Sequence, residues 1–454
     1  MTSALLFLRT LTLLLIEGAA ITAVLVPSGS WLLPLAMSLP IAAFANVLLV
    51  FLYTVAGVPL TGETLLGGHL IVTAAVIITI YRRPALLMDQ TRPAFTKLPK
   101  FAKIATVCAS LLIAMNAVYS FSHAVLLPSN QYDSATNWTM RSELSFYDEH
   151  MAFDSDESRG MAKPQYPFLF HALQVTANTG MLVWSDTAAN TILLLLSVGT
   201  FCTLFILTRK LRGTAHAAVT VAGIIGIPLL GLHLAQGYGD LNLVQYLLLS
   251  LLTLGVWLED GVRRNGRWLV LSGIFMAAAV WTKSEGSVFG LLPWVLTVGV
   301  VCMRNRTKMK EGTVAVITAA ALSIPWPVFA WTKGLSLTPH SSDTLFAFHS
   351  EGVSEALLGL FSRGSFGIDA YVLLALIPCL LFCTWKKHPS SEPRQLPLLI
   401  IGGVIFLEVL FIYLCTPNVR FLLDAESYYR QMMIPLALLV LACGLIYRSE
   451  KTPH

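Results

Sequence analysis

The chain has 454 residues, of which 56% are hydrophobic and only 12% are charged, and its net charge is +5. Soluble domains carry about 25% charged residues, so this composition excludes a string of soluble domains and predicts a polytopic membrane protein. The modest net charge predicts no nucleic-acid partner. All seven cysteines lie in or beside apolar segments, which favours neither a disulfide framework nor a zinc site.

Apolar segments recur along the whole chain. A transmembrane helix needs about 20 mostly apolar residues, and about thirteen segments approach that length. They lie near residues 4–26, 31–54, 64–81, 103–126, 187–208, 214–235, 241–258, 267–282, 287–303, 312–332, 368–385, 396–415 and 432–447. We therefore predict an all-α polytopic membrane protein with about thirteen transmembrane helices, in which residues 1–454 form a single transmembrane domain.

The basic residues indicate how these helices are oriented. Most of the 30 Lys and Arg residues lie in every second loop, and such loops face the cytoplasm. This alternation predicts an N-terminus outside and a C-terminus inside. It also predicts that the long loop 127–186 faces outward, together with the turns near 236–240, 283–285 and 416–430.

The most polar stretch of the chain runs from Asp133 to His171, inside the predicted outer loop. Charges in so apolar a chain must lie in water or in a site. The carboxylates of this stretch are Asp133, Glu143, Asp148, Glu149, Asp154, Asp156 and Glu157. We expect the group from Asp148 to Glu157 to be solvated. Residues 164–182 have apolar side chains at helical spacing, which predicts an amphipathic helix in the membrane interface.

Charged residues of both signs gather on the predicted outer face. They are Asp133, Lys163, Asp240, Lys283, Glu285 and Arg430. Such a mixture suits a protein that handles an anionic lipid headgroup or one that moves an ion. Sugar transfer from a lipid phosphate needs a carboxylate to take the proton of the acceptor hydroxyl. It also needs cations, or a metal, to neutralise the departing phosphate.

For that reaction we predict that Asp133 is the general base, because it begins the outer loop close to the membrane surface. The ring of Trp138 would form an apolar wall against one face of the sugar. Lys163 is the first candidate for contact with the donor phosphate, and Lys283 and Arg430 are the next candidates.

Each of these residues also has a structural alternative. Asp133 and Asp240 suit helix caps, Lys163 suits a side chain that reaches lipid headgroups, and Lys283 suits an ion pair with Glu285 in a short turn. Asp133 and Asp240 could share a divalent cation, although the sequence has no clear metal-ligand spacing.

Short motifs follow one another in a specific order. Asp133 and Trp138 lie in an acidic first outer loop, and the stretches 163–167 (KPQYP), 237–241 (GYGDL) and 282–286 (TKSEG) follow. This order resembles the bacterial branch of the GT-C glycosyltransferases, which includes aminoarabinose transferases and protein mannosyltransferases that use polyprenyl-phosphate sugars. The resemblance is good over residues 103–300 and weak in the C-terminal third.

The resemblance implies an enzyme of the bacterial inner membrane with its active site on the periplasmic side. It aligns Asp133 with the catalytic acidic residue of the family's first loop, Lys163 with the phosphate-contacting lysine and Asp240 with the acidic residue of the second loop. It also adds Tyr166 and Glu285 to the substrate-binding residues, alongside Trp138, Lys283 and Arg430, and implies an inverting displacement.

The resemblance also divides the chain into extra N-terminal helices (1–101), a GT-C-like catalytic core (102–310) and C-terminal helices (311–454). The family commonly places its acidic loop after the first span, whereas three spans precede it here. The chain also has no large soluble outer domain, which favours a small or lipid-linked acceptor.

We therefore predict a glycosyltransferase, of a hexose or a pentose, that moves a sugar from a polyprenyl-phosphate donor to a lipid-linked or surface glycan acceptor. A transporter or flippase of a lipid-linked glycan is the alternative. A transporter is expected to have internal repeats and broken helices with polar residues near the membrane midplane, and neither is evident here. A purely structural membrane protein would not need charges of both signs on one face.

Overall fold

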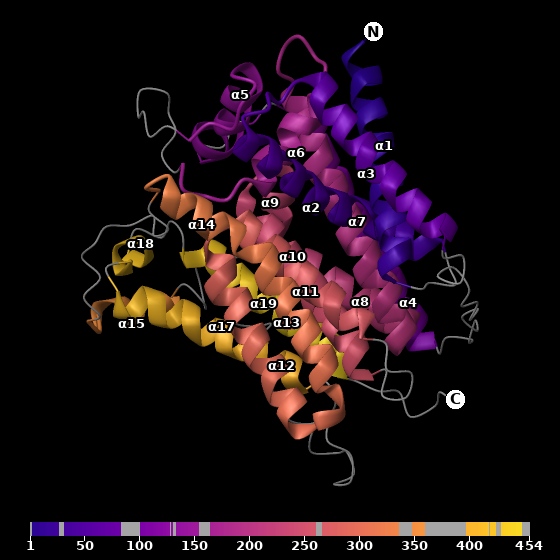
Figure 1. Ribbon diagram of the computed structural model, residues 1–454. Helices are drawn as coiled ribbons and strands as arrows, with labels where there is room; N and C mark the ends of the chain where they lie inside the picture. Colours follow the sequence, from indigo (N-terminus) through magenta and orange to yellow (C-terminus); the bar gives the residue numbers. More distant parts are fainter. Residues whose placement is uncertain are drawn as a thin grey trace.

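The computed structural model describes residues 2–26, 31–82, 100–127, 129, 133–153, 164–259, 266–335, 347–358, 396–416, 418–423 and 428–446. The regular elements of these residues are helices (Figure 1), which confirms the predicted all-α class. The first half contains α1 (Ser3–Leu25), α2 (Leu32–Ala56), α3 (Gly62–Arg82), α4 (Lys100–Leu126), η2 (Ser134–Thr139), α5 (Met140–Tyr147), α6 (Leu169–Ala177), α7 (Asp186–Arg212) and α8 (Thr214–Ile225). The second half contains α9 (Pro228–Gln236), α10 (Gly239–Glu259), α11 (Arg267–Thr282), η4 (Ser287–Leu291), α12 (Leu292–Arg304), η5 (Arg306–Lys308), α13 (Met309–Ser323), α14 (Pro325–Thr332), α15 (Glu351–Leu358), α17 (Leu396–Cys415), α18 (Val419–Leu423) and α19 (Tyr428–Ile446).

Within the described residues, 10 helices are long and apolar enough to cross a membrane, and the pair α8 and α9 makes up to 11. This pair bends by 79° where Pro228 begins α9. Helix α11 is apolar but has only 16 residues, and the span predicted at 368–385 lies outside the described residues. The protein is therefore an integral membrane protein, but the predicted number of about thirteen spans is not confirmed.

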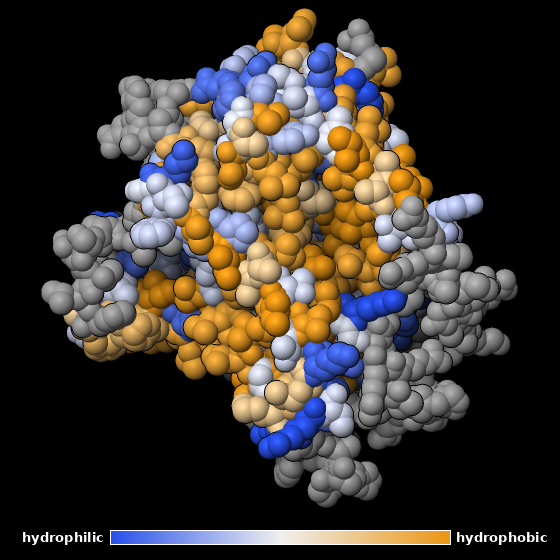
Figure 2. Space-filling model, in the orientation of Figure 1, coloured by the Kyte–Doolittle hydropathy of each residue, from blue (hydrophilic) through white to orange (hydrophobic). Residues whose placement is uncertain are grey.

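The surface of the molecule matches a lipid environment. Figure 2 shows hydrophobic residues over the middle of one face, with hydrophilic residues gathered toward its upper and lower ends. Large apolar side chains such as Ile71 on α3, Leu111 on α4 and Ile317 on α13 are exposed. A soluble protein would bury such an extensive apolar surface, whereas lipid tails solvate it.

Helix α10 lies at the centre of the bundle. Its whole apolar window is buried, and it packs against α11, α7 and α19. Small polar side chains join α10 to α11, because the Ser250 and Ser272 hydroxyls lie 3.0 Å apart. Trp294 Nε1 on α12 also donates to Ser272 Oγ, at 2.8 Å. Such bonds between helices replace the hydrophobic driving force that is absent in lipid. These bonds hold the middle of α10 against α11.

The N-terminal helices are joined to this core through α2. Helix α2 packs against α1, α7 and α6, and Tyr246 Oη on α10 donates to the Pro40 carbonyl at 2.9 Å. Helices α1 and α2 approach so closely that a Cβ at Gly18 would lie 1.8 Å from the Ser38 carbonyl oxygen. The three N-terminal helices therefore form part of one packed bundle with the predicted core.

The outer loop differs from the prediction in one respect. Helix α6 covers only Leu169–Ala177, and all of its residues are buried against α2, α5 and α7. The predicted interfacial helix over 164–182 is therefore wrong in length and in surroundings. Phe168 explains the burial, because its ring packs 5.6 Å from that of Trp281 and 5.5 Å from that of Trp326, inside the protein. Asp148 and Glu149 are exposed, as expected.

Candidate active site

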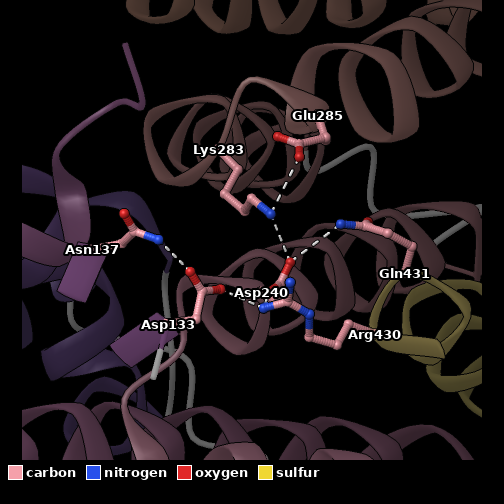
Figure 3. Close-up of polar contacts among 7 residues, drawn as sticks. All are labelled: Asp133, Asn137, Asp240, Lys283, Glu285, Arg430 and Gln431. Atoms are coloured by element: carbon pink, nitrogen blue, oxygen red, sulfur yellow. Dashed lines mark hydrogen bonds and ion pairs between the residues drawn. The ribbon is translucent and has the colours of Figure 1, made fainter. Parts of the chain in front are cut away.

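Charged side chains from four separate parts of the chain converge at one place (Figure 3). Asp133 directly precedes η2, Asp240 lies in the first turn of α10, Lys283 follows the last residue of α11, and Arg430 lies in the first turn of α19. With Glu285 they form a group that we call the charge cluster. Elements nearly 300 residues apart in the sequence are therefore brought together by the packing of α10, α11 and α19.

Asp240 is the centre of the charge cluster. Its Oδ1 accepts hydrogen bonds from Lys283 Nζ at 2.7 Å and from Gln431 Nε2 at 3.3 Å. Its Oδ2 lies 3.8 Å from Arg430 Nη1, and Lys283 Nζ also lies 3.2 Å from Glu285 Oε1. One buried carboxylate thus holds both cations in place.

Asp133 lies at the edge of the cluster. Its Oδ2 accepts a hydrogen bond from Arg430 Nη1 at 2.5 Å, and its Oδ1 accepts one from Asn137 Nδ2. Asn137 follows Asp133 by four residues, so the helical backbone brings the two side chains to the same face. The carboxylate is therefore held in a fixed orientation by groups on both sides.

The exposure of these side chains divides the cluster into a floor and a rim. The side chains of Asp240 and Lys283 are only 2% and 6% exposed, whereas those of Asp133, Arg430 and Glu285 are 22%, 24% and 25% exposed. The floor residues position the site from below. The rim residues are the ones that a ligand can reach.

Opposite charges favour the ionised forms of Asp133 and Lys283. Burial alone would raise the pKa of Asp133, but the Arg430 guanidinium outweighs it and holds that pKa below its ordinary value. Burial alone would lower the pKa of Lys283, but Asp240 and Glu285 hold it well above its usual range. At neutral pH the cluster therefore contains charged carboxylates beside charged cations.

Aromatic rings and glycines form the wall behind Lys283. Lys283 Nζ lies 5.3 Å from the ring centroid of Tyr166 and 6.0 Å from that of Trp138, and these two rings stack at 5.3 Å. A Cβ at Gly239 would lie 2.5 Å from the Trp138 ring, and Gly237 has a φ of +65° at the end of α9. The glycines of the GYGD stretch thus permit both the sharp turn and the close approach of Trp138.

Polar atoms without hydrogen-bond partners surround the charge cluster. Within the described residues, the buried unpartnered atoms on or next to these elements include Ser134 Oγ, Asn137 Oδ1, Ser284 Oγ, Glu285 Oε2, Tyr429 Oη, Arg430 Nε and Gln431 Oε1. Burial of an unpaired polar atom is costly, and buried polar groups in folded proteins are usually paired. Donors and acceptors that stay unpaired around one site are ready to bind a polar ligand.

The bundle resembles a solved structure in its fold. It superimposes on the crystal structure of ArnT from Cupriavidus metallidurans bound to undecaprenyl phosphate with a TM-score of 0.53 and 15% sequence identity, covering 75% of this chain and 60% of that one. The chain has a GT-C-like polytopic fold. This finding confirms the fold that the order of the motifs predicts.

The other comparisons add no further support for this fold assignment. The structure of the same ArnT in the apo state aligns with a TM-score of 0.43 and 13% identity, over 76% of this chain and 78% of that one. No protein-family model and no curated protein matches the sequence. The similarity to ArnT is therefore a similarity of fold.

The GT-C-like fold brings together most of the residues predicted for the site. Asp133, Asp240, Lys283, Glu285 and Arg430 all belong to the charge cluster. Trp138 is only 2% exposed and also stacks on His171, so protein rings surround it. Tyr166 is similarly buried, and Lys163 lies outside the described residues. The position between Asp133 and Asp240, considered for a divalent cation, is taken by the Arg430 guanidinium.

Two residues of the site were missed by the sequence analysis. Asn137 binds Asp133, and the four-residue spacing between them was a usable signal of that contact. Gln431 binds Asp240 from the neighbouring helix, and only its position next to Arg430 pointed to it. Asp240 also has a larger role than a helix cap, because it is the shared partner of both cations.

Proposed function

We propose that the protein is a glycosyltransferase that moves a sugar from a polyprenyl-phosphate donor to a lipid-linked or surface glycan acceptor on the extracytoplasmic face of the membrane. The observation that carries this proposal is the charge cluster with its unpartnered polar atoms, located where α10 and α19 begin. The fold similarity to an ArnT that was crystallised with undecaprenyl phosphate supports the choice of donor class.

The proposed reaction is a single inverting displacement. The acceptor hydroxyl oxygen forms a bond to the anomeric carbon of the donor sugar, and the bond from that carbon to the phosphate oxygen breaks. Asp133 takes the hydroxyl proton, and the polyprenyl phosphate leaves with the bonding electron pair. Asp133 is a rim carboxylate that a ligand can reach and whose pKa is held below its ordinary value, whereas Asp240 is buried against the two cations.

The leaving phosphate needs positive charge. Arg430 is the rim cation, and a guanidinium group can form two parallel hydrogen bonds to a phosphate. Lys283 lies on the floor and supports the site electrostatically through Asp240. The described part of the cluster has more carboxylates than cations, so an anionic donor needs a further cation. That is the role predicted for Lys163 from its motif.

Transfer by purified protein in proteoliposomes tests this proposal. Undecaprenyl-phosphate-linked hexose and pentose donors would be supplied with lipid acceptors, and products would be identified by mass spectrometry. Asp133→Asn keeps the shape and removes the base, so we expect the rate to fall about 100-fold or more. Glu149→Gln is the matched control, since it neutralises an exposed carboxylate of the same loop and should leave the rate near that of the wild type.

Two outcomes would contradict the proposal. Transfer by Asp133→Asn at the wild-type rate would remove Asp133 from the chemistry. Movement of the lipid-linked sugar across the bilayer without any transfer product would instead establish the flippase alternative.

A further inference from the structure

A second group of polar side chains is buried inside the N-terminal helices, away from the charge cluster. His69 on α3 contacts Glu17 on α1 through Nδ1 to Oε2 at 2.7 Å, and contacts Asn46 on α2 through Nε2 to Oδ1 at 3.0 Å. Thr176 on α6 donates to the same Asn46 oxygen at 2.8 Å. All four side chains are at most 1% exposed. We call them the N-terminal network.

The chemistry of the N-terminal network fixes its protons. The Asn46 oxygen is only an acceptor, so His69 Nε2 carries a hydrogen. Polar groups in so apolar a region are costly unless they are paired, so their contacts favour one arrangement of the helices that carry them.

The N-terminal helices also hold the outer loop at other points. Arg9 Nη2 donates to the Thr179 carbonyl at 3.5 Å, and Leu60 N donates to the Glu149 carbonyl at 2.6 Å. A Cβ at Gly62 would lie only 3.1 Å from Gly180. These contacts lie on both sides of α6. The Asn46–Thr176 hydrogen bond adds a buried side-chain link from α2 to α6 itself.

Helix α6 connects this network to the charge cluster. His171 precedes Thr176 on the same short helix, and its Nδ1 lies 3.0 Å from Ser142 Oγ on α5. The His171 ring also stacks 5.6 Å from that of Trp138, which belongs to the wall behind Lys283. A displacement of α6 would therefore be passed through packed rings to the lysine on the floor of the site.

We propose that Glu17, His69, Asn46 and Thr176 are positioning residues, by which the three N-terminal helices set α6 and thereby the geometry of the charge cluster. This inference rests on the proposed glycosyl transfer for its kinetic consequence. Its structural consequence, the coupling of α1–α3 to residues 133–147, does not depend on the reaction. The N-terminal network acts on the rate of transfer and leaves the binding of the donor nearly unchanged.

Thr176→Val tests this directly, because it keeps the shape of the side chain and removes only the hydroxyl that joins α6 to the network. We expect kcat for transfer to fall about fivefold, the scale of one hydrogen bond, while KM for the donor stays within about twofold. Hydrogen exchange of the backbone amides of residues 133–147 should become faster. Thr176→Ser restores a hydroxyl and should restore both values.

Thr73→Val is the matched control. Thr73 is a buried threonine of α3 whose hydroxyl has no hydrogen-bond partner among the described residues, so the same change removes no link. Unchanged exchange at 133–147 in Thr176→Val, or an equal effect in Thr73→Val, would overturn the inference. If the wild type transfers no sugar, the proposed function fails, and the exchange measurement still decides whether the network positions the loop.

Discussion

Two arginine sites join the same two core helices at their opposite ends. At the ends of α7, α10 and α19, Arg212 pairs with Glu259 at 2.5 Å and donates through Nε to the Leu445 carbonyl. At the beginnings of α10 and α19, Arg430 pairs with Asp133 at 2.5 Å and approaches Asp240 at 3.8 Å. Both sites link distant segments through an arginine and a carboxylate.

The two sites differ in what they leave unpaired. Neither Arg212 nor Glu259 has a buried side-chain atom without a partner, whereas Arg430 Nε, Gln431 Oε1 and Glu285 Oε2 are all unpartnered in the described chain. A pair whose atoms are all satisfied ties helices together. A pair surrounded by free donors and acceptors can exchange its partner for a ligand. The geometry of one ion pair is thus a weaker guide to function than whether the polar atoms around it have hydrogen-bond partners.

The largest effect is expected from removal of the arginine of the charge cluster. Arg430→Gln should lower transfer about 100-fold to 1,000-fold, because the leaving phosphate loses its reachable cation. The free energy of unfolding should change by only about 1 kcal/mol or less, since this pair is partly exposed. Steady-state kinetics and chemical unfolding in detergent measure the two. A variant that is strongly destabilised but transfers normally would reverse the roles given to the two arginines.

The same substitution at the other end should have the opposite profile. Arg212→Gln leaves Glu259 and the Leu445 carbonyl with weaker partners, so the free energy of unfolding should fall by about 2 kcal/mol. The kcat of the folded fraction should stay within about twofold of the wild type. Measurement of activity per folded molecule separates the two effects, and a loss of kcat here would show that this end also takes part in the reaction.

The pH dependence sharpens the comparison for Asp133. Arg430 holds the pKa of Asp133 below its ordinary value, so kcat/KM should stay level on its acid side until the pH falls below the usual range of an aspartate. The stabilisation from this pair is present above the unfolded-state pKa of about 3.9 and is lost as the pH falls through the folded-state pKa.

Two variants should shift the acid limb, which is the pH range in which kcat/KM falls as the pH is lowered. Arg430→Gln removes the main cause of the lowered pKa and leaves burial, which raises it, so the acid limb of the residual activity should move to higher pH. Asn137→Leu removes a weaker cause and should give a smaller shift of the same sign. A profile with the same acid limb in all three proteins would assign the base to another residue.

Sequence reasoning found the charged residues of the site but not their order of importance. Asp133, Asp240 and Lys283 were visible because charges are rare beside apolar spans. The central position of Asp240 was not visible, because it depends on how α19 packs on α10. The burial of α6 was missed for a similar reason, since apolar spacing on a short helix does not show whether lipid or protein covers it.

The N-terminal helices show the same limit. Glu17, Asn46 and His69 lie on three different helices, and no spacing in the sequence relates them. Only the crossing of α1, α2 and α3 brings their side chains together. Conversely, the GYGD stretch was conspicuous as a motif, but its physical reason, the Trp138 ring against Gly239, required the structure.

The smallest effect is expected from Gln431, which borders the cluster without carrying charge. Its bond to Asp240 is long at 3.3 Å, and its Oε1 has no hydrogen-bond partner among the residues that the structure describes. If that oxygen accepts a sugar hydroxyl in the ground state and in the transition state alike, Gln431→Leu should raise KM for the donor about fivefold and leave kcat unchanged. Gln245→Leu is the matched control, because that buried amide already donates to Ser197 Oγ at 2.5 Å inside the bundle. It should lower stability without changing KM, and a fall in kcat for Gln431→Leu would instead place this amide among the groups that act only in the transition state.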